Sequence, residues 1–188
     1  MYKMISFSNN FIFIHINKTA GSSIEAALKN YGIKKPLIKD GNFPHSQHFK
    51  YDDYKDYIGD NFINFYTFTV VRNPWDRAVS YYHNGAITKN LNFNDWIIDR
   101  YKNNNFLDYL RMYQPCTEWF DKVDKILRFE SINKDFNDLC SELNLTCKLK
   151  HYNNTKHRQA YHEYYTEETK QIIYDYFIDD INAFNYKF

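Results

Sequence analysis

Two short segments of this chain carry residue types suited to binding an anion. One is residues 18–23, which read Lys-Thr-Ala-Gly-Ser-Ser, and the other contains Arg72 and Ser80. The first segment follows an apolar run at residues 11–16 and precedes an amphipathic stretch, so it joins a strand to a helix. Such a junction directs several backbone N–H groups and the positive end of a helix dipole toward one point. The segment is therefore typical of a loop that binds a phosphate or a sulfate.

A purely structural explanation of the same loop is a capping box. In that arrangement Ser22 and Glu25 satisfy the first N–H groups of the helix, and no ligand is involved. A standard nucleotide-triphosphate loop is disfavoured, because the Walker A pattern needs a glycine, four further residues and then Gly-Lys-Ser/Thr. Here Lys18 precedes Gly21, and the turn contains no earlier glycine. Two explanations of the loop are therefore left open: an anion-binding loop that is not a Walker A loop, and a capping box.

Arg72 directly follows a second apolar run, residues 62–71. Asn73 is a favourable N-cap and Pro74 a favourable first helical residue, so a helix is predicted to begin there and to continue past Ser80. The planar guanidinium of arginine is suited to phosphate because it makes paired, charge-assisted hydrogen bonds. The structural alternative is that Arg72 pairs with a nearby carboxylate such as Asp76.

The elements around these segments predict an α/β fold. Strands are predicted over residues 11–16, 62–71 and 123–129; helices over 22–30, 50–58, 93–102, 117–121, 131–143 and 166–179, with a possible short strand near 37–38. Alternating strands and helices indicate a P-loop-like, three-layer domain with a mainly parallel central sheet flanked by helices. Ligands of such sheets bind beyond the carboxyl ends of the strands, where Lys18 and Arg72 both fall. We therefore expect the two residues to face one ligand.

Bulk composition limits the function classes. The 188 residues suffice for one domain with a full core, and we treat residues 1–188 as a single domain. The formal net charge of +1 argues against a broad electrostatic surface for nucleic acid. Aromatic residues make up 20% of the chain, which fits either a sugar-binding cleft or the amino-acid usage of an AT-rich genome.

Cysteine usage and hydropathy bear on the compartment. Cys116, Cys140 and Cys147 form no CxxC pair and are odd in number, so we expect reduced thiols rather than a disulfide framework. No stretch approaches the roughly 18 consecutive apolar residues of a membrane span. The run at residues 11–16 is too short for a signal peptide. A cytoplasmic protein without a transmembrane segment is expected.

Taken together, the two segments resemble a known enzyme family. The sequences IHINKTAGSSI (residues 14–24) and VVRNPWDRAVSYY (residues 70–82) resemble the sulfotransferases that use 3′-phosphoadenosine 5′-phosphosulfate (PAPS). The resemblance is closest to the carbohydrate-type branch, sulfotransferase family 2. It implies that Lys18, Thr19, Ala20, Gly21, Ser22 and Ser23 bind the 5′-phosphosulfate. It also implies that Arg72 and Ser80 bind the 3′-phosphate.

The resemblance continues through most of the chain. Residues 126–139 are similar to a family segment that reads ILRFEN and to its following helix, and residues 151–186 to the end of the family's domain. Arg158 lies in the late loop that contacts PAPS in the family, where it either closes over the nucleotide or is a surface arginine. Asn17 stands where the family usually has proline, a change that removes no ligand group.

The chemistry of sulfuryl transfer assigns further roles. The acceptor hydroxyl attacks sulfur in line, and adenosine 3′,5′-bisphosphate (PAP) leaves; by analogy with phosphoryl transfer, positioning and electrostatics do most of the work. Lys18 is the cation best placed for the leaving oxygen. A histidine is the natural general base near neutral pH. His48 fits the family's spacing to Gly59 better than His45, and the alternative is that both are solvated loop residues.

The sequence therefore predicts a PAPS-dependent O-sulfotransferase acting on a hydroxyl of a carbohydrate, such as a glycan or glycolipid. No metal is expected, because no cysteine or carboxylate pair accompanies His45 and His48. The alternatives are a non-catalytic protein that binds PAP or PAPS and, with less support, a nucleotide-dependent kinase. No nucleic-acid partner is expected.

Overall fold

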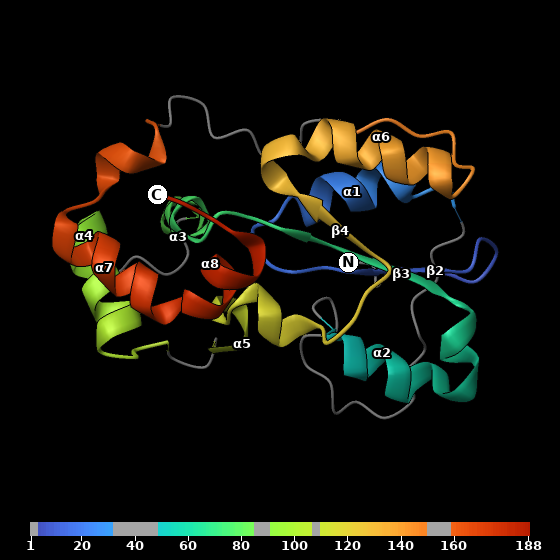
Figure 1. Cartoon of the computed structure of the whole chain (residues 1–188), viewed down its shortest axis with the longest axis horizontal. Helices are drawn as coiled ribbons and strands as arrows, with labels where there is room; N and C mark the ends of the chain where they lie inside the picture. The colour runs from blue at the N-terminus through green and yellow to red at the C-terminus, as the bar shows by residue number, and fades with distance from the viewer. Residues whose placement is uncertain (1–3, 32–48, 85–90, 107–109, 150–158) are drawn as a thin grey trace. The chain divides into compact units, whose positions relative to one another are not determined.

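The structure is a computed structural model that describes residues 4–31, 49–84, 91–106, 110–149 and 159–188. It divides into two units, which we call the sheet unit and the helical unit. The sheet unit comprises Met1–Val71 and Trp119–Tyr152, and the helical unit comprises Arg72–Glu118 and Asn153–Phe188. Figure 1 shows the elements of both units along the chain.

The sheet unit is built on four strands in the order β1-β2-β3-β4. They are β1 (Met4–Ser6), β2 (Phe11–Ile14), β3 (Tyr66–Val71) and β4 (Lys125–Arg128). The pairs β2–β3 and β3–β4 are parallel, and β1 pairs with β2 antiparallel. The mainly parallel α/β sheet is thus confirmed, whereas the short strand β1 was not predicted.

The strand register sets the edge at which a ligand is expected. Ile14 lies opposite Thr69, and Val71 lies opposite Arg128. The carboxyl ends of β2, β3 and β4 therefore lie at one edge of the sheet, which is where parallel sheets bind their ligands.

Helices cover both faces of this sheet. Helices α1 (Gly21–Leu28) and α6 (Ile132–Glu142) lie on one side, and α2 (Tyr51–Ile58) lies on the other (Figure 1). The apolar side chains between the sheet and the first two helices form one cluster of buried residues. It contains Phe11, Phe13, Ile24, Leu28, Phe68, Val70, Leu127, Ile132, Phe136, Leu139, Cys140 and Leu145. Burial of this cluster holds α1 and α6 against the sheet.

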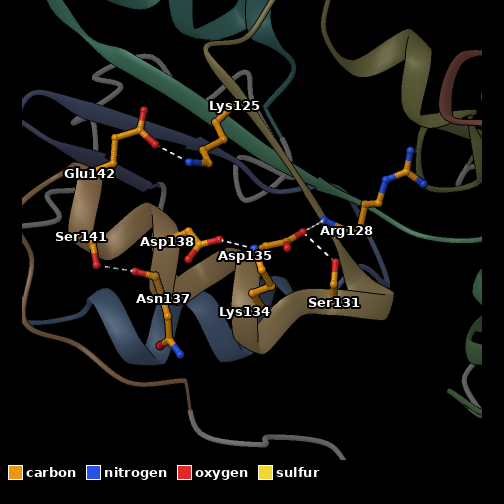
Figure 2. Close-up of polar contacts among 9 residues, drawn as sticks. All are labelled: Lys125, Arg128, Ser131, Lys134, Asp135, Asn137, Asp138, Ser141 and Glu142. Carbon is orange, nitrogen blue, oxygen red and sulfur yellow. Dashed lines mark hydrogen bonds and ion pairs between the residues drawn. The ribbon is translucent and has the colours of Figure 1, made fainter.

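Polar contacts fix α6 against β4 (Figure 2). The Asp135 carboxylate accepts hydrogen bonds from the backbone N–H of Arg128 at 2.8 Å and from the Ser131 hydroxyl at 2.9 Å. At the other end of the helix, Lys125 forms an ion pair with Glu142. Both ends of α6 are therefore held against β4.

The helical unit contains no strand in the residues that the structure describes. Its elements are α3 (Pro74–Tyr82), α4 (Phe93–Ile97), the π-helix η2 (Ile98–Lys102), α5 (Leu110–Tyr113), η6 (Tyr161–Tyr164), α7 (Glu167–Tyr176) and α8 (Ile178–Phe184). The short 3-10 helix η4 (Cys116–Trp119) runs from the helical unit into the sheet unit. Large aromatic side chains fill the core of the helical unit: Trp96, Tyr101, Tyr113 and Phe177 are at most 4% exposed. The abundant aromatic residues therefore serve packing to a large extent.

Two sequence predictions need correction. The first three residues of the strand predicted over 62–71 belong to a 3-10 helix, η1 (Gly59–Asn64), and the strand itself begins at Tyr66. Ile63 is 88% exposed in this helix, so its apolar side chain was misleading. The single helix predicted over 166–179 is two helices, α7 and α8. Phe177 leaves the helical conformation between them, and its ring packs against that of Tyr101. The strand considered near 37–38 lies outside the described residues.

Candidate functional site

The loop of residues 18–23 connects β2 to α1 in the sheet unit. Lys18 and Ala20 both adopt left-handed backbone conformations, with φ of 63° and 74°. This conformation costs a non-glycine residue about 1 kcal/mol or more, so the surrounding contacts must hold the loop in shape. Successive backbone N–H groups in such a turn form a concave group of donors suited to an anion.

The backbone donors of this loop are the strongest sign of a binding site. Within the part of the chain that the structure describes, nothing accepts a hydrogen bond from the backbone N–H groups of residues 19–22. The first donor with a partner is the N–H of Ser23, which bonds to the carbonyl of Ala20 at 2.9 Å. The first N–H groups of a helix have no partner within the helix, and no side chain caps α1, so these donors are available to an anion at the carboxyl edge of the sheet.

The capping-box explanation of this loop is wrong. The N-cap of α1 is Ala20, and no side chain caps the helix. Glu25 does not reach back to the helix start; its carboxylate instead lies 2.8 Å from Nδ1 of His15, the residue that follows β2. The polar residues therefore leave the first N–H groups of the helix available to a ligand.

His15 explains the glycine of the loop. A Cβ atom built on Gly21 would lie 1.9 Å from Cδ2 and Nε2 of the His15 ring, a distance that no packed structure allows. The ring is 6% exposed, stacks on Phe13 with the centroids 5.7 Å apart, and is held by Glu25. The side chain of His15 thus supports the loop from beneath, and only glycine can lie against it.

The loop's side chains differ in what they can offer a ligand. Thr19 is fully buried, and its hydroxyl donates to the carbonyl of Ile16 at 2.8 Å, which closes the turn. Lys18 and Ser22 are half-buried, and Ser23 is buried. We infer that Thr19 can act on a ligand only through its backbone N–H, whereas Lys18 and Ser22 reach the surface.

Arg72 and Ser80 belong to the helical unit. Arg72 lies two residues before α3 begins, and Ser80 lies within α3. The Arg72 side chain forms an ion pair with Asp76, in which Nε and Nη2 both lie 2.7 Å from Oδ2. The pairing considered from sequence is therefore present. It uses two of the five N–H donors of a guanidinium and fixes the plane of that group. Ser80 is half-buried.

Asn73 fixes the N-terminus of α3 in two directions. Its Oδ1 accepts from the backbone N–H groups of Trp75 and Asp76 at 3.1 and 3.4 Å, as predicted for an N-cap. Its Nδ2 donates to the carbonyl of Lys187 at 2.9 Å. Tyr165 adds a bond from its hydroxyl to the carbonyl of Trp75 at 2.8 Å. The C-terminal segment therefore holds the helix start that carries Arg72, a function that the sequence did not reveal.

Arg77 is a buried residue that sequence reasoning missed. It is fully buried, and its Nη1 donates to the carbonyl of Gln114 at 2.9 Å, while Nη2 lies 3.4 Å from the Tyr81 hydroxyl. Burial by itself would lower the pKa of Arg77, but the surrounding Cys116, Tyr81 and Asp180 raise it above its usual range. Arg77 therefore stays charged and joins α3 to the loop before η4.

Three of the predicted site residues cannot be placed. His45, His48 and Arg158 lie outside the described residues. In the part of the chain that is described, no group of three or more His, Cys, Asp or Glu side chains is arranged to hold a metal ion. Nor does this part contain a helix whose length and apolar character would let it cross a membrane.

Comparison with known proteins decides the family. A family model described as "Sulfotransferase family" (sulfotransferase family 2) matches residues 3–187. This chain belongs to the sulfotransferase family. As a sulfotransferase it transfers sulfuryl groups, and the match extends through both units.

The fold of this sulfotransferase has a solved counterpart. The crystal structure of a sulfotransferase from Alicyclobacillus acidocaldarius is similar, with a TM-score of 0.52 and 16% sequence identity, over 92% of each chain. At that identity the likeness shows the shared α/β fold. A comparison with curated protein sequences gave no match.

Proposed function

We propose that this sulfotransferase uses PAPS as its donor and transfers the sulfuryl group to a hydroxyl of a carbohydrate. The observation that supports this most is the run of backbone N–H groups at residues 19–22 for which the described residues supply no acceptor. Donors of this kind suit the charged oxygens of a phosphosulfate. PAPS, when bound, supplies the sulfuryl group and a stable leaving group, PAP.

In this proposal the sheet unit acts on the 5′ end of the nucleotide. The backbone N–H groups of residues 19–22 and the Lys18 ammonium stabilise the negative charge that develops on the departing phosphate. Fixed donors of this type cost no reorganisation during the reaction, and removing one typically costs 10²- to 10³-fold in rate. His15 and Glu25 act indirectly, since they hold the loop in its left-handed conformation.

In the same proposal the helical unit binds the 3′-phosphate through Arg72 and Ser80. The pairing with Asp76 orients the guanidinium before any nucleotide arrives. An oriented fork loses less side-chain entropy on binding than a mobile one. The two units then act as one sulfotransferase domain, in line with a single family model that matches both.

The proton of the acceptor hydroxyl needs a base, for which we propose His48, with His45 as the second candidate. We further propose that Arg158 closes over the nucleotide. These three roles rest on the resemblance of the sequence to the family. The carbohydrate acceptor rests on the same resemblance, and a glycan or a glycolipid would satisfy it.

A thermal-shift titration tests the donor. PAP at saturating concentration should raise the melting temperature, as a ligand that binds only the folded state must, whereas ATP at the same concentration should not. A shift with ATP alone, or with neither nucleotide, would contradict the proposed donor.

A matched pair of histidine variants tests the base. His48→Ala should reduce turnover of a carbohydrate acceptor panel by at least 10²-fold while it leaves the PAP-induced thermal shift unchanged, and His45→Ala should retain turnover. The reverse result would exchange the two assignments. PAP binding without turnover of any hydroxyl acceptor would favour a non-catalytic PAP-binding protein.

A further inference from the structure

Two cysteines that sulfuryl transfer does not use lie together at the end of α6. Cys140 is in the last turn of this helix and Cys147 is in the segment that follows it, and both are free thiols. The chain reverses its direction between the two cysteines. Asn144 adopts a left-handed backbone conformation, with φ of 53°. Its N–H donates to the carbonyl of Ser141 at 3.2 Å, and the N–H of Leu145 donates to the carbonyl of Cys140 at 2.7 Å. This pair of bonds is the Schellman motif, which turns the chain back along the helix.

The reversal places the two thiols beside one pocket. Cys140 is 4% exposed and belongs to the buried apolar cluster under α6, and Cys147 packs against the same cluster. Both cysteines line the same pocket, and each thiol is near enough to the other to shift its pKa. Because the intervening turn is fixed by backbone hydrogen bonds, this placement is a property of the folded chain rather than a chance approach of two mobile groups.

The pair is open to small reagents. An open pocket of about 580 Å³ is lined by both cysteines and by their neighbours along α6 and the segment after it, including Ser141 and Lys148. Figure 2 shows the polar residues of this end of the helix, among them Asn137 and Ser141, which also line the pocket. Cys147 is half-buried, so its sulfur is the one closer to solvent.

We propose that Cys140 and Cys147 are an oxidation site that forms a reversible intramolecular disulfide. The proposal is independent of the donor and acceptor assigned above. It also differs from what the sequence indicated, since the spacing of the three cysteines suggested no pairing.

The environment sets the order of the reaction with a peroxide. Burial raises the pKa of Cys140 above its usual range, and the nearby Cys147 thiol adds to this. Burial also raises the pKa of Cys147, but the nearby Cys140 thiol opposes the rise. Cys147 is also half-buried whereas Cys140 is buried, so a peroxide reaches Cys147 first and Cys147 is the attacking thiol. Since the thiolate is a minor species near neutral pH, the oxidation is slow compared with that of a specialised peroxidase.

The chemical steps balance with hydrogen peroxide as the oxidant. The Cys147 thiolate attacks one peroxide oxygen, the O–O bond breaks, and hydroxide leaves, which gives a sulfenic acid on Cys147. The sulfur of Cys140 then attacks the Cys147 sulfur, the S–OH bond breaks, and the protons of the two thiols complete two molecules of water. Two thiols are oxidised, and one peroxide is reduced.

Peptide mapping of the full chain tests this proposal. Trypsin cleaves after Lys134 and Lys148 and nowhere between them, so both cysteines fall in one peptide, residues 135–148. After peroxide treatment and alkylation in denaturant, this peptide should have lost two hydrogen atoms and carry no alkyl group. Dithiothreitol should reverse the change. The peptide of residues 112–122 carries Cys116, which is fully buried, and it serves as the internal control that should remain reduced.

Two variants test the order of attack. Cys140→Ser should leave Cys147 as a sulfenic acid that dimedone traps, whereas Cys147→Ser should leave Cys140 reduced and free of dimedone. Disulfide-linked dimers, alkylation of both cysteines after oxidation of the wild type, or equal oxidation of Cys116 would overturn the proposal. The wild-type peptide decides this even if a variant does not fold.

Discussion

The loop of residues 18–23 and the start of α3 are both candidate anion sites, but they are built in different ways. The loop offers backbone N–H groups, held in place by left-handed residues and by the buried pair of His15 and Glu25. The start of α3 offers one guanidinium, that of Arg72, which the carboxylate of Asp76 orients. The first site depends on the shape of the chain, and the second depends on one side chain.

This difference teaches which substitutions are informative. A site made of backbone donors survives most side-chain truncations and is lost when its shape is lost. A site made of one arginine is lost when that arginine is removed, while the fold remains.

The largest effect is expected at the one side chain of the loop that carries charge. Lys18→Met keeps the length of the side chain but removes the ammonium that stabilises the leaving phosphate. We expect kcat to fall about 10³-fold, with the affinity for PAP reduced less. Lys29→Met, an exposed lysine just after α1, is the matched control and should keep its activity. A Lys18→Met enzyme with wild-type kcat would contradict the role of the loop.

The shape of the loop is tested at its glycine. Gly21→Ala places a methyl group 1.9 Å from atoms of the His15 ring, and overpacking of this kind costs about 3 kcal/mol of unfolding free energy. Urea unfolding measures the loss. If the contact with His15 causes this loss of unfolding free energy, the double variant with His15→Ala should recover a large part of it. The coupling energy between the two substitutions should then be about 1–2 kcal/mol. Strictly additive losses would mean that another contact requires the glycine.

The smallest effect is expected at the carboxylate of the second site. Asp76→Asn retains an oxygen that can accept from Arg72 but removes a negative charge next to the proposed 3′-phosphate. We expect PAP to bind about threefold more tightly at low salt, with a smaller gain at high salt, as screened electrostatics require. Isothermal titration calorimetry at two salt concentrations measures both. Weaker binding of PAP would mean that the charge of Asp76 is needed to orient Arg72.

Much of the fold could be predicted from the sequence. The apolar run at residues 11–16 and the Asn73-Pro74 pair located β2 and the start of α3, because periodicity and capping are local signals. Gly59 ends α2 with φ of 67°, as its place after the predicted helix indicated. Local signals failed at Phe62 and Ile63, where an apolar pair belongs to a 3-10 helix, and at the three-residue strand β1, which is too short to show a period.

The site residues stay a prediction from the sequence, and the contacts that hold some of them in place could not be predicted. Residues 18–23 and Arg72 were visible because strand ends and residue types can be read from sequence. The pairing of Glu25 with His15 could not be, since a capping box has the same spacing. Likewise, the bond from Asn73 to the carbonyl of Lys187 joins residues far apart in the chain, and no local pattern reports such contacts.

We propose above that the loop and Arg72 bind opposite ends of one nucleotide. Calorimetric titration of PAP and of adenosine 5′-phosphate, which lacks the 3′-phosphate, into the wild type and Arg72→Ala tests it most directly, with Lys187→Met as an exposed control. Loss of a charged hydrogen-bonding partner is worth about 2 kcal/mol, or roughly thirtyfold in affinity. We predict that Arg72→Ala loses about this much for PAP and almost nothing for adenosine 5′-phosphate. An equal loss for both nucleotides, or no loss for either, would contradict the claim.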